Sequence, residues 1–308
     1  MAAGCAFAHE TPIAVLELKE GKPGQYLMHW IYSSSKGLGA PTATFPEQCT
    51  VNAPMLDCGE RGLVGTLTVN ELGTRYTGAV VRITRRDAPA QSFALTGSNP
   101  ASPSSPNPGS SFAAKLDIAG AYIQIGIEHI LLGVDHLLFV LGLIWIVRSR
   151  WMLLKTITAF TVAHSITLAA ATFGWVGVPE RVVNAAIALS IVFIGVEIIR
   201  LQRGDMGLTV RQPWIVAFCF GLLHGFGFAT ALTNLGLPPG DLPLALFSFN
   251  AGVEIGQVAF VLLVLALAWS ARALEVRWPR WTLPIPAYAI GGIASFWFIV
   301  RMAMIIGA

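Results

Sequence analysis

The last two thirds of the chain consist of long apolar blocks separated by short polar connections. A helix needs about 20 predominantly apolar residues to cross a bilayer, and six blocks reach roughly that length. They span about 121–147, 151–173, 181–200, 214–236, 243–269 and 284–306. This pattern predicts a polytopic α-helical membrane protein with about six transmembrane helices. The first and fifth blocks are long, so each either tilts or begins as an interfacial helix.

The first third has a different pattern, in which short runs rich in Val, Ile, Leu, Thr and Tyr are separated by clusters of Gly, Pro and Asn. Such runs are typical of strands, and we expect four of them at 13–18, 25–32, 63–72 and 79–86. We therefore predict a small all-β domain, similar to a β-sandwich, over residues 9–96. Residues 97–111 are rich in Pro, Ser and Gly, which predicts a linker to a transmembrane domain at 112–308.

The N-terminal residues and two cysteines indicate an oxidising compartment. Ala6-Phe7-Ala8 fits a small-x-small cleavage site, so residues 1–8 are interpreted as the remnant of a signal peptide. Cleavage there would make His9 the first residue and a copper-type ligand, and the alternative is an untethered chain end. Cys49 and Cys58 both lie in the β domain, where oxidising conditions favour a disulfide between them.

Composition narrows the class of protein further. Only 12% of the 308 residues are charged, against about 25% in an average soluble domain. The mean hydropathy is +0.64 and the net charge is +3. These values exclude a disordered chain, an ordinary cytosolic enzyme and a nucleic-acid binder built on a basic surface.

The basic residues predict the orientation of the helices. They gather in three connections: Arg148, Arg150 and Lys155 between the first and second blocks, Arg200, Arg203 and Arg211 between the third and fourth, and Arg272, Arg277 and Arg280 between the fifth and sixth. The positive-inside rule makes these connections cytoplasmic. The β domain and the C-terminus are then extracytoplasmic, at a bacterial inner (plasma) membrane.

Ligand-type side chains lie near the centres of four apolar blocks. The centres fall near residues 134, 162, 225 and 256, and His136, His164, His224 and Glu254 each lie within about 3 Å of one of these depths. Ionisable groups are costly in a bilayer and mark functional sites by default. Three imidazoles and a carboxylate at one depth predict a transition-metal site. The alternative is a buried hydrogen-bond network that fixes helix packing.

Further polar residues accompany this set. His129 shares a helix face with His136 and lies about 10 Å nearer the outer surface, where it would receive the metal. Asp135 either binds the metal or orients a histidine of a neighbouring helix. Other polar side chains would support the ligands or line a path, namely Glu128, Thr161, Ser165, Asn250 and Gln257.

Two more features concern packing. Glycines surround His224 in the segment 221–228, and small residues let a second helix approach closely. Arg301 lies inside the last apolar block. It either snorkels to the membrane surface or neutralises a buried carboxylate.

Four motifs in this order resemble the HupE/UreJ family. They are Gly126-Ile-Glu-His-Ile-Leu-Leu-Gly-Val-Asp-His-Leu-Leu-Phe139, Thr161-Val-Ala-His-Ser-Ile-Thr167, His224-Gly-Phe-Gly-Phe-Ala229 and Asn250-Ala-Gly-Val-Glu-Ile-Gly-Gln257. The resemblance covers about 116–308 and is strongest to the branch with an extracytoplasmic N-terminal domain. It implies an accessory membrane protein of hydrogenase and urease that acts as a nickel or cobalt permease, with metalloenzyme maturation proteins as partners.

Three functions fit these residues. The first is binding and inward transport of a divalent transition metal, with Ni²⁺ favoured and Zn²⁺, Cu²⁺ or Co²⁺ as alternatives, because imidazole suits all of these metals. The second is an intramembrane zinc-dependent hydrolase, since three His and a carboxylate also describe a catalytic zinc site. The third is a metal sensor or chaperone that relays metal from the outer domain. The chain has no Walker A motif, so we expect no ATP hydrolysis, and transport is favoured over an enzyme.

Overall fold

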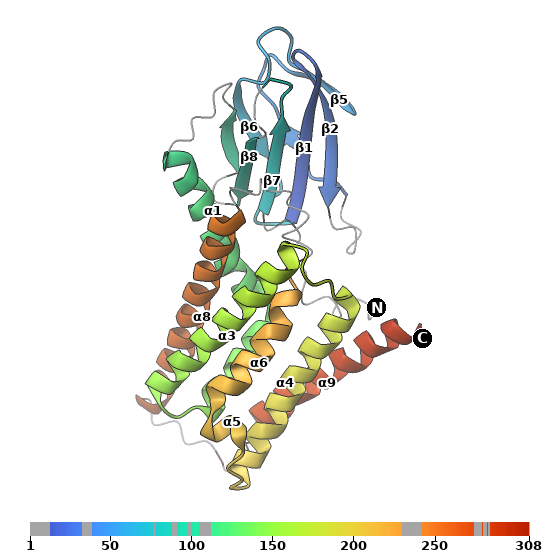
Figure 1. The fold of residues 1–308 in the computed structure, drawn as a ribbon. Coiled ribbons are helices and arrows are strands. Elements are labelled where there is room, and N and C mark those ends of the chain that lie inside the picture. Colours follow the sequence, from blue (N-terminus) through green and yellow to red (C-terminus); the bar gives the residue numbers. More distant parts are fainter. Residues whose placement is uncertain are drawn as a thin grey trace. The chain divides into compact units, whose positions relative to one another are not determined.

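Figure 1 shows the fold in a computed structural model of the chain. The structure describes residues 13–32, 39–76, 78–87, 91–97, 100–104, 112–229, 242–273, 279, 282 and 284–307. The predicted signal remnant and His9 lie outside this range. The chain forms two compact units, one containing Thr11–Ile125 and Ala231–Phe249, the other containing Gly126–Thr230 and Asn250–Ala308.

The N-terminal part of the chain is an all-β structure, as predicted. Its strands are β1 (Ile13–Lys22), β2 (Gln25–Tyr32), β3 (Ala43–Thr44), β4 (Thr50–Asn52), β5 (Met55–Asp57), β6 (Gly65–Val69), β7 (Gly78–Thr84), β8 (Gln91–Thr96) and β9 (Ala101–Ser104). One sheet has the order β4-β5-β2-β1-β7-β8 and the other has the order β3-β6-β9. β1 pairs with β2 in antiparallel and with β7 in parallel orientation.

The two sheets share one apolar core. Alternation along β1 and β7 turns Leu16, Leu18 and Val81 inward, and Leu67 and Val69 of the second sheet meet them there. The four strands expected from the sequence are present as β1, β2, β6 and β7. Most of the other strands have only two to four residues, so they are too short to show a clear alternation. β9 lies in the stretch predicted as a linker and pairs with β6.

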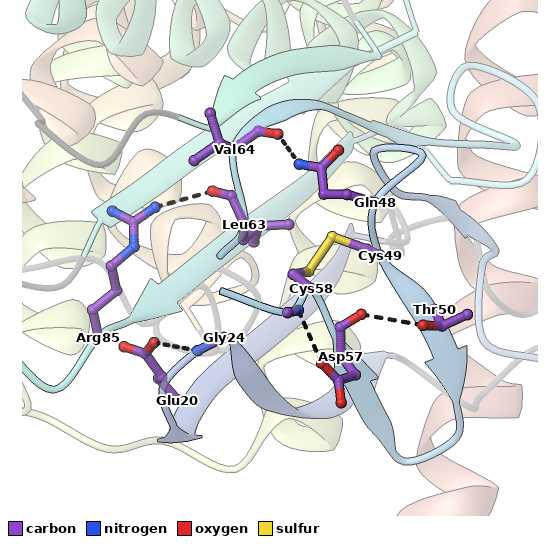
Figure 2. The surroundings of a disulfide bond; sticks show 11 residues. Glu20, Gly24, Gln48, Cys49, Thr50, Asp57, Cys58, Leu63, Val64 and Arg85 are labelled. Atoms are coloured by element: carbon purple, nitrogen blue, oxygen red, sulfur yellow. Dashed lines mark hydrogen bonds between the residues drawn. A yellow bond between two sulfur atoms is a disulfide. The ribbon is translucent and has the colours of Figure 1, made fainter. Parts of the chain in front are cut away.

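Cys49 and Cys58 form a disulfide beside this core, and Figure 2 shows its surroundings. The neighbouring Asp57 carboxylate accepts hydrogen bonds from the backbone N–H of Gly59 and from Nε2 of Gln25, each at 2.9 Å. Both bonds favour the ionised form. They therefore hold the pKa of Asp57 below its usual value, with the Gly59 bond as the larger cause.

The remainder of the described chain is helical. The helices are α1 (Phe112–Leu132), α2 (Val134–Ile146), α3 (Arg150–Thr172), α4 (Glu180–Gln202), α5 (Leu208–Arg211), α6 (Pro213–Phe226), α8 (Leu242–Ala273) and α9 (Ile285–Ile306). Local sequence determines where several of these helices begin or end. Ser149 caps α3 by accepting the Met152 N–H, Pro213 begins α6, and Gly307 ends α9 in a left-handed conformation.

The prediction of about six transmembrane helices is confirmed only in part. Within the described residues, α3, α4, α8 and α9 are long and apolar enough to cross a membrane, and α1 with α2 counts as a fifth span if that pair is one segment. The block 121–147 is not a continuous helix, because α1 and α2 meet at a bend of 71°. The block 214–236 begins with α6, which has only 14 residues, and 230–241 lie outside the described residues.

Small residues bring α3 and α6 close together, as the glycines around His224 predict. An added Cβ on Gly221 would lie 2.5 Å from the Phe160 carbonyl oxygen, and one on Gly225 would lie 2.3 Å from the His164 carbonyl oxygen. The contacts advance in the same direction along both helices, so α3 and α6 run parallel. This packing fixes where His164 lies relative to α6.

Candidate metal centre

Three histidines from three successive helices form a buried cluster, which we call the histidine triad. His129 comes from α1, His136 from α2 and His164 from α3, and they offer ligand atoms that all lie within 4.8 Å of one another. Their exposed fractions are 2%, 0% and 0%. Since histidines are seldom gathered inside a membrane protein without a role, this cluster is the leading candidate for a functional site.

The break between α1 and α2 at Gly133 brings His129 and His136 together. The backbone leaves helical geometry there, with ψ at 87°. A Cβ on Gly133 would lie 2.7 Å from the His129 carbonyl oxygen and 2.8 Å from Nδ1 of His136. Because no side chain fits in that space, glycine permits the ring centroids of the two histidines to lie 4.9 Å apart.

The triad fits a transition metal after a small closure. Four ligands at about 2.1 Å around a tetrahedral ion stand roughly 3.4 Å apart, which is about 1.4 Å less than the 4.8 Å within which the triad atoms lie. Side-chain rotation can supply such a change. Imidazole nitrogen suits Ni²⁺, Cu²⁺ and Zn²⁺, so the donor atoms agree with the predicted class of metal without choosing among its members.

Asn250 of α8 orients the His164 ring. Its Oδ1 lies 3.1 Å from Nδ1 of His164, and both side chains are buried. An amide oxygen only accepts hydrogen bonds, so this contact places the imidazole proton on Nδ1 and leaves Nε2 as the nitrogen whose lone pair is suited to a metal. Asn250 was predicted to support the ligands, and its position is suited to that role.

His224 of α6 lies next to the triad on the side of His136. The ring centroids of His136 and His224 are 4.8 Å apart. Nε2 of His224 lies 3.2 Å from Oγ of Ser190 on α4. His224 is therefore a neighbour of the triad, which on the described residues does not include it.

Asp135 precedes His136 in the chain but contacts a cation. Its Oδ2 accepts a hydrogen bond from Nη2 of Arg301 at 3.0 Å, and the two side chains are 0% and 4% exposed. The sequence predicts two alternative roles for Arg301, and the structure shows the second, neutralisation of a buried carboxylate. The carboxylate thus lies in an ion pair between α2 and α9.

The remaining polar residues join α8 to α3. Oε1 of Glu254 accepts a 2.6 Å hydrogen bond from Thr158, and Oε1 of Gln257 accepts a 3.0 Å bond from Thr161. With the contact between Asn250 and His164, these pairs form a row that we call the polar seam. Its buried end is at His164, and its exposed end is at Thr158.

A comparison with known families agrees with these residues. The family model described as HupE / UreJ protein matches residues 110–301, which is more than half of the chain. The chain belongs to the HupE/UreJ family. This family implies an accessory membrane protein that handles nickel or cobalt, and the match contains the whole histidine triad. No curated protein and no solved structure matches the chain.

In this HupE/UreJ protein the predicted ligands fall into two groups. His129, His136 and His164 lie together, whereas His224, Asp135 and Glu254 have the partners described above. Among the supporting residues, Ser165 donates its hydroxyl hydrogen bond to the carbonyl oxygen of Thr161 on its own helix. Glu128 is half-buried on α1, one residue before His129.

Sequence reasoning missed three residues of the site. Ser190 contacts His224, Thr158 contacts Glu254, and Phe228 packs on His129 with ring centroids 4.5 Å apart. Ser190 and Thr158 are polar residues inside apolar blocks, which was a usable signal. Phe228 had no such signal, because an aromatic residue is common in any apolar block.

Proposed function

We propose that this HupE/UreJ protein is a membrane permease that binds and moves a divalent transition metal inward, with Ni²⁺ as its cargo. The observation that carries the proposal is the histidine triad, which gathers three buried imidazoles from three helices. The membership of the family supports nickel or cobalt as the class of metal. Within the site, all three histidines hold the ion, because His129 lies against His136 and not about 10 Å nearer the outer surface, as a continuous helix would place it.

The polar seam supports a route between the triad and one end of α3. The side chains become steadily more exposed from His164 through Gln257 and Thr161 to Glu254 and Thr158. Amide, hydroxyl and carboxylate oxygens are suitable partners for a divalent cation in transit. Thr158 lies nearer than His164 to the N-terminus of α3, the end where the basic residues Arg148 and Arg150 predict the cytoplasm.

We also propose six membrane segments, with the β domain and the C-terminus outside an inner (plasma) membrane, and the helix directions agree with the alternation of the six segments. In such an arrangement segments two and four run parallel, and segments three and six run antiparallel. α3 and α6 are parallel. α4 and α9 are antiparallel, because Gly195 lies against Gly291 whereas Arg181 bonds to the carbonyl of Met304. In this proposal α6 belongs to the fourth segment.

The test measures nickel binding and nickel uptake with the same variants. We would purify the full chain, its His136→Ala and His164→Ala variants, and a His29→Ala control, which removes an exposed histidine on β2. Elemental analysis would count bound metal, and proteoliposomes would report uptake. We expect both triad variants to lose binding and uptake, and the control to keep both.

Other outcomes would overturn the proposal. Equal nickel binding and uptake in all four proteins would make the triad a packing network. About one zinc per chain that survives chelator washing and needs the triad, without any metal flux, would favour the hydrolase. Loss of nickel capture only on removal of the β domain would favour the chaperone.

A further inference from the structure

A groove of about 450 Å³ lies along α3 and α6, apart from the histidine triad. It begins near the N-terminal ends of the two parallel helices. The α3 residues that line it are spaced i, i+3, i+4, i+7, i+8 and i+11, so they share one helix face. The lining consists of Trp151, Leu154, Lys155, Thr158, Ala159 and Val162 of α3 and Trp214 and Phe218 of α6.

One end of the groove is cationic and bordered by tryptophan. Nζ of Lys155 lies 4.3 Å from the centre of the Trp214 ring. Lys155 is exposed, and 81% of Trp151 is exposed. Lys and Trp near the ends of membrane helices mark the level of the lipid headgroups. No Asp or Glu is among the described residues that line the groove, and Lys155 is the charged residue of that lining. The nearby Glu254 carboxylate accepts a hydrogen bond from the lining residue Thr158.

The rest of the groove is apolar. Leu154, Ala159, Val162 and Phe218 continue it for about 16 Å along α3, counted from Trp151 to Val162. Water in such a groove would make few hydrogen bonds, so hydrocarbon is the favoured occupant inside a bilayer. An amphiphile with one anionic head and an alkyl chain complements both the charge and the apolar lining.

We propose that this groove binds one anionic phospholipid, with its phosphate at Lys155 and an acyl chain along Ala159, Val162 and Phe218. A zwitterionic lipid matches less well, because its own ammonium group opposes Lys155 and the preceding basic residues Arg148 and Arg150. The bound lipid also covers the line of contact between α3 and α6, the two helices that position His164 and His224. The proposal concerns lipid binding and does not depend on metal transport.

The experiment is native mass spectrometry of the full chain released from nanodiscs with equal amounts of phosphatidylglycerol and phosphatidylcholine. We expect one retained phosphatidylglycerol per chain. Lys155→Gln should lower its retention about fivefold, the effect of one lost cation at an anionic headgroup. Arg203→Gln is the matched control, because it removes an exposed positive charge outside the groove.

A second variant tests the apolar part. Ala159→Phe fills the groove and should abolish retention of both lipids while leaving the fold and nickel binding intact. Equal retention of the two lipids by the unmodified chain, or unchanged retention in Lys155→Gln, would overturn the proposal. A dimer that carries no lipid and dissociates in Ala159→Phe would assign the groove to a second copy of this chain.

Discussion

The guanidinium of Arg301 and the carboxylate of Asp135 form an ion pair with a separation of 3.0 Å, and both side chains are almost completely buried. The second guanidinium nitrogen, Nη1, donates to the carbonyl oxygen of Asn184 at 2.8 Å. One cation therefore ties α9 to both α2 and α4. Because Asp135 immediately precedes His136, this ion pair also holds the start of α2, where the triad histidine lies.

We predict that Arg301→Met destabilises the protein by about 3–5 kcal/mol, because it leaves Asp135 as a buried carboxylate without its cation. Unfolding in detergent, followed by circular dichroism, would measure the loss. The double variant Arg301→Met/Asp135→Asn should recover most of it, because it also removes the negative charge.

Arg203→Met is the control for that experiment, since Arg203 is exposed and should tolerate the change within about 0.5 kcal/mol. If Arg301→Met unfolded like the control, the ion pair would not hold α9 in place. If the double variant were as unstable as the single one, the cost would come from packing of the arginine stem.

Gly225→Ala should weaken nickel binding through the backbone of a different helix. Its Cβ would lie 2.1 Å from Oγ1 of Thr167 and 2.3 Å from the carbonyl oxygen of His164, so α3 and α6 must separate. Overpacking of this kind costs about 1–3 kcal/mol. Thermal unfolding and nickel titration of the same sample would measure both effects.

Gly292→Ala is a matched control, because nothing lies within 4 Å of the added Cβ and the position is in the middle of α9. It should be neutral or stabilising, since alanine favours helix by about 1 kcal/mol over glycine. Nickel binding by Gly225→Ala at the unmodified level would show that the close approach does not position His164.

Depth along apolar blocks predicted which residues lie near the histidine triad, but not their partners. Residues of similar depth share a level in the bilayer, and His136 and His164, two of the four residues predicted at one depth, do lie together. His129 joins them although its depth predicted a position about 10 Å away. The pattern could not show how each helix is rotated about its axis. That rotation decides that Asp135 meets Arg301 and that Glu254 meets Thr158.

The break at Gly133 was equally hidden from the hydropathy pattern. The block 121–147 is apolar throughout, so its length predicts one long helix. A single glycine is tolerated in a helix and carries little information by itself. The break is explained only by a tertiary contact, which the sequence does not show. The bend of 71° brings His129 against His136.

We predict that acid destabilises the β domain, because protonation of Asp57 removes a stabilising contribution. Its pKa lies below the usual value because the Gly59 N–H and the Gln25 amide donate to the carboxylate. The stabilising contribution is therefore present above the unfolded pKa of about 3.9 and is lost as the pH falls through the lower folded value. Reduction of the Cys49–Cys58 disulfide by a phosphine would report the opening.

Asp57→Asn provides the comparison, since it keeps the shape and removes the titration. We expect the variant to be reduced faster than the unmodified chain at pH 6 and at an equal rate once Asp57 is protonated. A ratio of the two rates that stays constant between pH 6 and pH 3 would contradict the role of the charged form.

Asn250→Leu should lower nickel affinity about 10–100-fold, the usual cost of losing a partner that orients a histidine ligand. Leucine fills a similar volume but cannot accept the hydrogen bond from Nδ1 of His164. Asn250→Asp restores an acceptor oxygen and should recover most of the affinity. Spectra of bound Co²⁺, which report ligand geometry, would accompany the titration. An unchanged affinity in Asn250→Leu would mean that helix packing alone sets the tautomer and orientation of His164.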